Sequence, residues 1–216
     1  MLNKVLYTGS FLLIFTLIIC AQPSSVINNN SGLNRTIDSI LQKQVDLDKI
    51  PGAVIIIKKD GKIITRKAYG YAMKYDFNHS LIKKPEKMSV RHMFDIASLT
   101  KVIGTTTSIM LLHDKGLLNI DDPVFKYVKA FDTPEKKRIT IRNLLTHTSG
   151  IYEWYPMYYR ASQKEECFRL ISDLPLKFPV GEQRKYSDLG FTVLGEIIEI
   201  VSGQTLDQFT SLAPAF

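Results

Sequence analysis

FDIASLTK, residues 94–101, is the stretch of the 216-residue sequence on which the fold prediction depends. The residues that follow it are mostly apolar up to Lys115, and Gly116 comes next. This pattern predicts a helix over residues 98–115 with Gly116 as its C-cap. Because apolar side chains fall on most faces of that helix, we expect it to lie inside the protein.

Ser98 and Lys101 open this helix and form the candidate reactive pair. Residues three apart share a helix face, so the lysine can lie against the serine oxygen. A serine hydroxyl needs a base to become a good nucleophile, and a lysine desolvated by an apolar helix is expected to have a lowered pKa. The backbone N–H of Ser98 would point towards incoming negative charge. A plain helix start is the alternative interpretation.

A second chemical feature is YSD, residues 186–188. It precedes an amphipathic helix that ends at Gly203, so Ser187 or Asp188 is predicted to be the N-cap. If this segment lies near Ser98, the Tyr186 phenol supplies a general base, held partly ionised by a lysine ammonium.

Other patterns indicate a mixed α/β fold. A first helix is predicted from apolar residues at helical spacing: Ile37, Ile40, Leu41 and Val45. Residues 53–57 are β-branched, Asp60-Gly61 is a strong two-residue hairpin turn, and residues 62–68 form the return strand. Residues 72–90 are polar and are expected to be a loop.

Two further features of the sequence allow alternative interpretations. His147 and Ser149 could be read as a histidine–serine pair, but no Gly-x-Ser-x-Gly elbow or acidic partner accompanies them, so a structural loop is favoured. Aromatic residues at 150–160 either line a substrate cleft or pack within a loop; they are Tyr152, Trp154, Tyr155, Tyr158 and Tyr159.

The order of the motifs resembles one known family. Serine-x-x-lysine followed by tyrosine-x-asparagine is the signature of class C β-lactamases, penicillin-binding proteins, D-peptidases and related esterases. The similarity extends over about residues 35–209 and includes the stretches LLTHTSG (144–150), YSDLGF (186–191), DKGL (114–117) and DDPV (121–124). The resemblance implies an α/β (α+β) fold of β-lactamase/transpeptidase type, with a helical region and part of an antiparallel sheet.

The resemblance also implies roles for individual residues. Ser98 corresponds to the acylated nucleophile, Lys101 to its proton-managing partner and Tyr186 to the general base. Asp188 stands where asparagine usually contacts the substrate amide, and its carboxylate would pair with Lys101 and favour Tyr186 as the base. The implied reaction is acyl transfer on an amide, β-lactam or ester, including peptidoglycan-like substrates, without metal or cofactor. The alternative is a catalytically silent envelope lipoprotein or ligand-binding fragment.

One motif of that family is not found. Its third motif, Lys-Thr-Gly or His-x-Gly, has no match in residues 189–216. We therefore expect residues 33–216 to be an amino-terminal part of the domain, truncated at the carboxy end. In that family the strand with the third motif also supplies one backbone donor of the oxyanion hole. The fragment alone would therefore be nearly inert, because losing one such donor lowers turnover by about 10²–10³.

The first residues predict export. A lysine and an apolar run over residues 11–19 are followed by small and polar residues, which is typical of a signal peptide over residues 1–21. A cut after residue 19 would leave Cys20 free for lipid attachment, and a retained anchor is the other alternative. Residues 22–32 are a polar linker. The expected location is the periplasm or cell envelope.

Composition restricts the remaining functions. With 45% hydrophobic and 23% charged residues, the chain is globular rather than disordered. The net charge of +7 comes from scattered lysines without a nucleic-acid motif, so no nucleic-acid partner is expected. The two cysteines offer neither a sensible disulfide nor metal-ligand spacing. The oligomeric state is left open.

Overall fold

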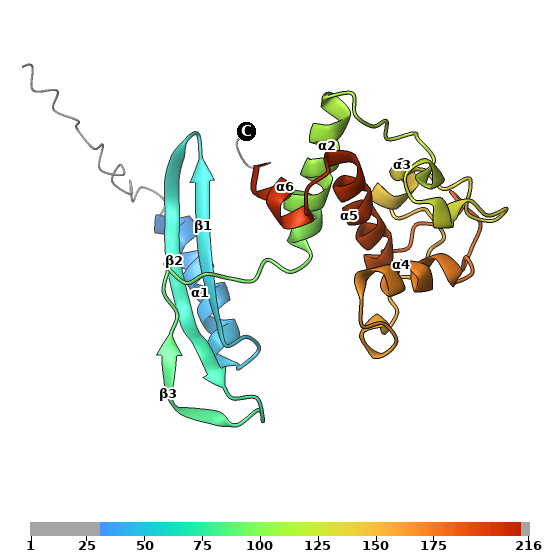
Figure 1. Cartoon of the computed structure of the whole chain (residues 1–216). Coiled ribbons are helices and arrows are strands. Elements are labelled where there is room, and N and C mark those ends of the chain that lie inside the picture. The colour runs from blue at the N-terminus through green and yellow to red at the C-terminus, as the bar shows by residue number, and fades with distance from the viewer. Residues whose placement is uncertain (1–30, 213–216) are drawn as a thin grey trace, which may run out of the picture. The chain divides into compact units, whose positions relative to one another are not determined.

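The computed structural model describes residues 31–212, which form two compact units divided between Phe94 and Asp95 (Figure 1). Unit 1 holds the sheet and unit 2 holds most of the helices. The signal peptide, Cys20 and most of the linker predicted from the sequence lie outside the described residues. No helix in residues 31–212 is both long and apolar enough to cross a membrane.

Unit 1 is a helix followed by an antiparallel sheet of order β1-β2-β3. Its elements are α1 (Ser31–Asp46), β1 (Gly52–Lys59), β2 (Lys62–Tyr75) and β3 (Leu81–Lys87). Asp60 and Gly61 have φ of 49° and 75°, so both central residues of the hairpin turn are left-handed, as the sequence predicts.

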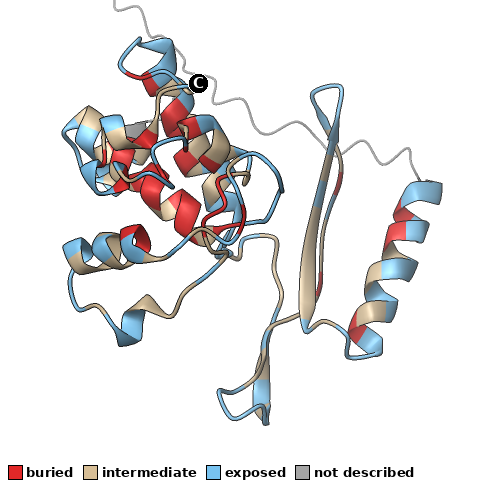
Figure 2. Cartoon of the chain, turned by 90° about the vertical axis from the view of Figure 1, so that its right-hand side faces the viewer, coloured by how far each residue is buried: buried red, intermediate tan, exposed pale blue. Residues whose placement is uncertain are grey.

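Helix α1 packs on one face of the sheet through a small apolar core. Ile37 and Val45 of α1 and Tyr69 of β2 are its buried members, and the buried residues of α1 lie on the side that faces the sheet (Figure 2). Asp38 reinforces this contact, because its carboxylate accepts hydrogen bonds from Lys67 Nζ at 2.7 Å and from Tyr69 Oη at 2.7 Å. The predicted helix and hairpin are confirmed.

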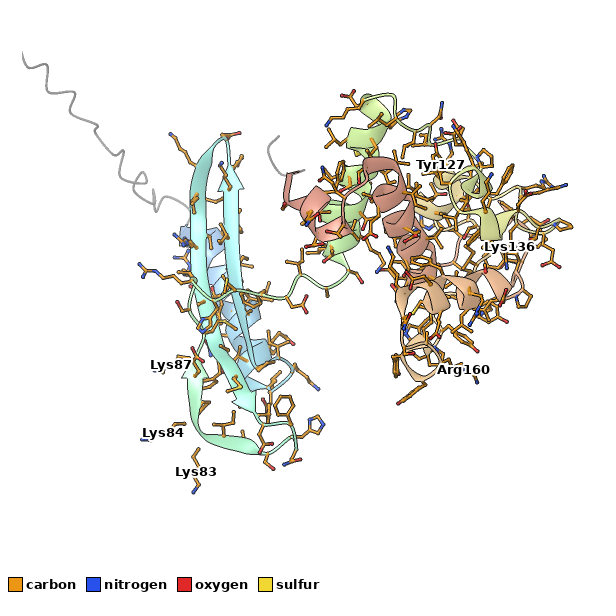
Figure 3. The ribbon with its side chains drawn as sticks, viewed as in Figure 1. Lys83, Lys84, Lys87, Tyr127, Lys136 and Arg160 are labelled. Atoms are coloured by element: carbon orange, nitrogen blue, oxygen red, sulfur yellow. The ribbon has the colours of Figure 1, made fainter. Side chains whose placement is uncertain are left out.

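The prediction of a loop over residues 72–90 is wrong for much of its length. Strand β2 continues to Tyr75, and β3 pairs with it in register Tyr71–Lys87 and Tyr75–Leu81. The strand is hard to recognise because it lies at the sheet edge, where lysines and a proline are tolerated. Lys83, Lys84 and Lys87 extend away from the ribbon (Figure 3).

Unit 2 is built around one apolar helix. Its α-helices are α2 (Thr107–Asp114), α3 (Ile141–Leu145), α4 (Lys164–Asp173), α5 (Asp188–Ser202) and α6 (Leu206–Leu212). Helix α5 is central, since its residues Val193, Leu194, Ile197 and Ile198 have 0% exposure. They belong to a core shared with buried residues of α2, α3, α4 and α6.

The helix predicted over residues 98–115 is present, but it is not buried all round. Its buried face includes Ile109 and Leu112, whereas four apolar residues on the other side are exposed: Leu99, Val102, Ile103 and Met110. The sequence prediction of a fully buried helix is wrong because the described residues of unit 2 cover only one face of it. Gly116, predicted to be the C-cap, is instead the residue after the C-cap Lys115, where its φ of 69° is the left-handed conformation that ends many helices.

Candidate active site

Ser98 lies at a strained turn directly before the helix. The preceding residue, Ala97, has φ of 44°, which is unusual for a residue with a side chain, and its N–H donates to Asp95 Oδ1 at 2.7 Å. Ser98 is exposed, and its carbonyl accepts the Lys101 N–H at 3.1 Å. Backbone outliers of this kind are concentrated at functional sites, so the turn supports a role for the serine that it presents.

Lys101 begins a π-helical segment, Lys101–Thr106, that sequence analysis did not predict. The wider turn leaves backbone carbonyls for side chains to bind: Thr106 Oγ1 donates to Lys101 O at 2.8 Å, and Thr107 Oγ1 to Val102 O at 3.1 Å. The residues around Gly104 are weak helix formers, and this is the sequence feature that could have indicated a departure from a regular α-helix. π-Helical turns are frequently found at functional sites.

The second motif is fixed at the start of α5. Ser187 is the N-cap, because its Oγ accepts the Gly190 N–H at 2.9 Å and donates to Tyr152 O at 2.6 Å. Asp188 is the first residue of the helix, where the helix dipole favours a negative charge, and its N–H donates to Glu153 O at 2.8 Å. Of the two predicted N-caps, Ser187 is the correct one.

The two motifs meet in an ion pair. Lys101 Nζ is 2.7 Å from Asp188 Oδ1, with side-chain exposures of 18% and 47%. Burial lowers the pKa of Lys101, but hydrogen bonds with Asp188 and Tyr186 outweigh it, so the net shift is upward. The expectation of a lowered lysine pKa is therefore wrong, whereas the predicted Lys101–Asp188 pairing is found.

Ser98, Lys101 and Tyr186 line one hollow of about 430 Å³, which His147 also borders. Lys101 Nζ lies 5.2 Å from the centre of the Tyr186 ring and 5.9 Å from that of Phe191. All four residues predicted from the motifs are thus gathered in unit 2, although the two motifs are far apart in the sequence. A nucleophile, a cation and a phenol around one hollow are the components of acyl transfer.

Aromatic residues border a neighbouring hollow of about 600 Å³, which Asp188 also lines. Trp154, Tyr155 and Tyr158 form part of its wall. A third hollow, of about 530 Å³, is lined by both Lys101 and Asp188. The Lys101–Asp188 pair therefore lies between the hollow that Ser98 lines and the hollow that the aromatic residues line. For Trp154, Tyr155 and Tyr158, this geometry favours the interpretation as part of a substrate cleft.

The histidine–serine alternative is not supported by the geometry. Ser149 is 2% exposed, and its Oγ accepts the Ile151 N–H at 3.4 Å. His147 Nδ1 accepts the Ser187 N–H at 3.0 Å, so that ring nitrogen is engaged with backbone. Ser149 acts within the loop, as favoured from the sequence, whereas His147 binds the backbone of the 185–187 segment.

A helical unit and an antiparallel sheet, together with a serine, a lysine and a tyrosine around one hollow, define the β-lactamase/transpeptidase-like class. The chain belongs to the beta-lactamase family, whose model matches residues 37–211. The sequence-based fold prediction is confirmed by a solved class C beta-lactamase, which superposes with a TM-score of 0.69 at 22% identity over 83% of this chain and 46% of that one.

Two further relatives are more similar in sequence. The N-acetylmuramyl-L-alanine amidase of Bacillus subtilis (strain 168) is 32% identical over 189 residues, which are 82% of this chain and 42% of the amidase. The structure of EstCE1, a hydrolase with promiscuous acyltransferase activity, superposes with a TM-score of 0.69 at 27% identity, over 83% of this chain and 50% of that one. The chain spans half or less of the length of these relatives.

Proposed function

We propose that the protein is a serine hydrolase that acts through an acyl-enzyme on Ser98. The observation that carries this proposal is the Lys101–Asp188 pair, 2.7 Å apart, beside the hollow that Ser98, Lys101 and Tyr186 line. A lysine held charged cannot take a proton, so Tyr186 is assigned as the general base and Lys101 as the cation that stabilises its phenolate.

The proposed reaction has two halves. The phenolate of Tyr186 removes the hydroxyl proton while Ser98 Oγ bonds to the substrate carbonyl carbon. The bond from that carbon to the leaving nitrogen or oxygen then breaks, and Tyr186 returns the proton to the leaving group. In the second half Tyr186 removes a proton from water, whose oxygen bonds to the carbon of the Ser98 ester. The bond from that carbon to Ser98 Oγ then breaks, and Tyr186 gives the proton to Oγ, which releases the acid and restores the serine.

An amide of a peptidoglycan-like peptide is the substrate class that we favour over a β-lactam or a simple ester. The B. subtilis relative is named for cleavage at a muramyl-alanine amide, and the aromatic hollow next to Asp188 provides wall area for a group larger than an ester. The test of the function is a covalent adduct: a fluorophosphonate should modify the protein at Ser98, located by peptide mass mapping. Absence of any adduct would favour the catalytically silent alternative.

Asp188→Asn is expected to change the pH dependence of the reaction more than its rate at neutral pH. Without the carboxylate, the raised pKa of Lys101 falls, so Lys101 loses its charge at a lower pH. The alkaline limb of the pH–rate profile therefore shifts to lower pH. Below that limb the rate should change less than tenfold, because a half-exposed ion pair contributes only about 0–1 kcal/mol. The measurement is the pH profile of Ser98 labelling.

Asp188→Asn is also expected to remove the stabilisation that the ion pair gives to the fold, and this effect depends on pH. Because the pKa of Lys101 is raised by folding, the pair stabilises the fold fully below the unfolded pKa of lysine and loses this effect as pH rises through the folded pKa. Asp121→Asn, which breaks the exposed Arg142–Asp121 pair at 2.6 Å, is the matched control. An unchanged alkaline limb in Asp188→Asn would contradict the role of the pair.

We also propose that the protein is exported to the periplasm or cell envelope, where peptidoglycan-like substrates occur. The support is the apolar run over residues 11–19 and the small residues after it, all outside the described part of the chain. The intact mass of protein purified from the envelope should correspond to a chain that begins at Gln22, or at Cys20 with an attached lipid. A mass that retains residues 1–19 would indicate a membrane anchor instead.

A further inference from the structure

His147 holds the backbone on both sides of Tyr186. Its carbonyl oxygen accepts the Lys185 N–H at 2.9 Å, and its Nδ1 accepts the Ser187 N–H at 3.0 Å. One residue therefore binds the N–H groups of Lys185 and Ser187, the residues on either side of the candidate base. Because Nδ1 accepts a hydrogen bond, the neutral ring must carry its proton on Nε2.

The histidine ring also packs on the tyrosine ring. The His147 and Tyr186 ring centres are 4.6 Å apart, and Phe191 lies on the histidine at 5.1 Å. His147 has φ of 60° at the end of α3, a position where glycine or asparagine would be less strained. The backbone hydrogen bonds and the ring contact together place the His147 side chain directly against the candidate base.

We infer that His147 is a positioning residue, which as the Nε2–H tautomer fixes the 185–187 segment and so directs the Tyr186 phenol into the hollow shared with Ser98 and Lys101. This inference rests on the proposed function, in which Tyr186 is the base. It assigns His147 no contact with the reacting atoms. It also explains how a phenol on an exposed side chain keeps a defined direction.

The charges around His147 fit this role. Burial lowers the pKa of His147, Lys101 and Arg184 lower it further, and Asp188 opposes them. The ring is therefore neutral at pH 7, with Nδ1 free to accept. As the pH falls through the pKa that His147 has in the folded protein, Nδ1 gains a proton that faces the Ser187 N–H. The stability that the neutral ring contributes to the fold above the pKa of an unfolded histidine is then lost.

The first experiment reads the hydrogen bond itself and needs no activity. Nitrogen-15 NMR of the histidine-labelled protein should show His147 as the Nε2–H tautomer at pH 7. The Ser187 amide should be protected from hydrogen exchange at that pH and lose protection on acidification. A His147 ring protonated on Nδ1 at pH 7 would overturn the inference whether or not Ser98 reacts, and failure of Ser98 to react would count against the proposed function alone.

The second experiment compares variants by the rate of fluorophosphonate labelling of Ser98. His147→Ala should slow labelling about 10- to 100-fold, since misplacing a base by a small distance has effects of this size. His147→Asn keeps an acceptor and tolerates the left-handed backbone, so it should lie between His147→Ala and the parent protein. Because asparagine does not titrate, its profile should lack the acidic loss due to His147.

A matched control is available in unit 1. His79 is exposed and also has φ of 60°, so His79→Ala repeats the backbone change in the unit that holds none of the candidate site residues, and it should leave labelling unaltered. Labelling of His147→Ala within about twofold of the parent would overturn the inference. If His147→Ala does not fold, the pH profile of His147→Asn decides, and an acid limb identical to the parent's would overturn it.

Discussion

Replacement of Ser98 by alanine is expected to abolish fluorophosphonate labelling and to lower hydrolytic turnover by about 10⁴-fold or more. Removing the nucleophile of a serine hydrolase leaves only the rate enhancement due to binding and to the remaining polar groups. Ser98 is exposed at the turn before the helix, so the loss of one oxygen should hardly affect folding. The measurement is initial-rate hydrolysis together with the adduct mass, on protein whose thermal unfolding matches that of the parent.

Ser149→Ala is the matched control for this prediction. Ser149 belongs to the other serine motif, is 2% exposed and contributes its hydroxyl only to the loop contact with Ile151. Its replacement should leave labelling intact. Labelling that persists in Ser98→Ala and disappears in Ser149→Ala would mean that the nucleophile has been assigned to the wrong serine.

Local sequence patterns were sufficient for those features whose causes are local. The Asp60-Gly61 turn follows from two residues that tolerate positive φ. The helix-ending Gly116 and the N-cap Ser187 follow from their positions at helix ends. The spacing of Ser98 and Lys101 allows them to pair, and the resemblance to the family's order of motifs favours this pairing over a plain helix start. The candidate site could be proposed from the sequence because its two motifs each combine a reactive side chain with a helix start.

Features that depend on distant contacts were missed. The pKa of Lys101 is raised rather than lowered because its partner Asp188 comes from another part of the sequence, and burial alone suggests the opposite direction. Strand β3 exists through pairing with β2, which its own lysine-rich sequence does not indicate. The role of His147 also depends on tertiary structure, since it consists of hydrogen bonds to Lys185 and Ser187.

Tyr186→Phe is expected to lower the rate of acyl transfer by about 10²–10⁴, the usual contribution of a general acid–base group. The change removes one oxygen and keeps the ring, so the packing on His147 at 4.6 Å and the approach of Lys101 Nζ at 5.2 Å can remain. Stability should therefore change little. The measurement is initial-rate hydrolysis of an acyl p-nitroanilide and of the p-nitrophenyl ester of the same acid.

The two substrates distinguish the two roles assigned to Tyr186, which are to remove the Ser98 proton and to protonate the leaving group. A departing anilide needs a proton from the tyrosine, whereas p-nitrophenolate leaves without one, so Tyr186→Phe should slow the anilide more than the ester. Tyr159→Phe is the control, because Tyr159 is 81% exposed and is not among the residues that line the aromatic hollow; it should alter neither rate more than about twofold. Equal losses on anilide and ester would show that Tyr186 does not protonate the leaving group. A loss below threefold on both would return the role of base to Lys101, whose ammonium would then have to give up its proton beside Asp188.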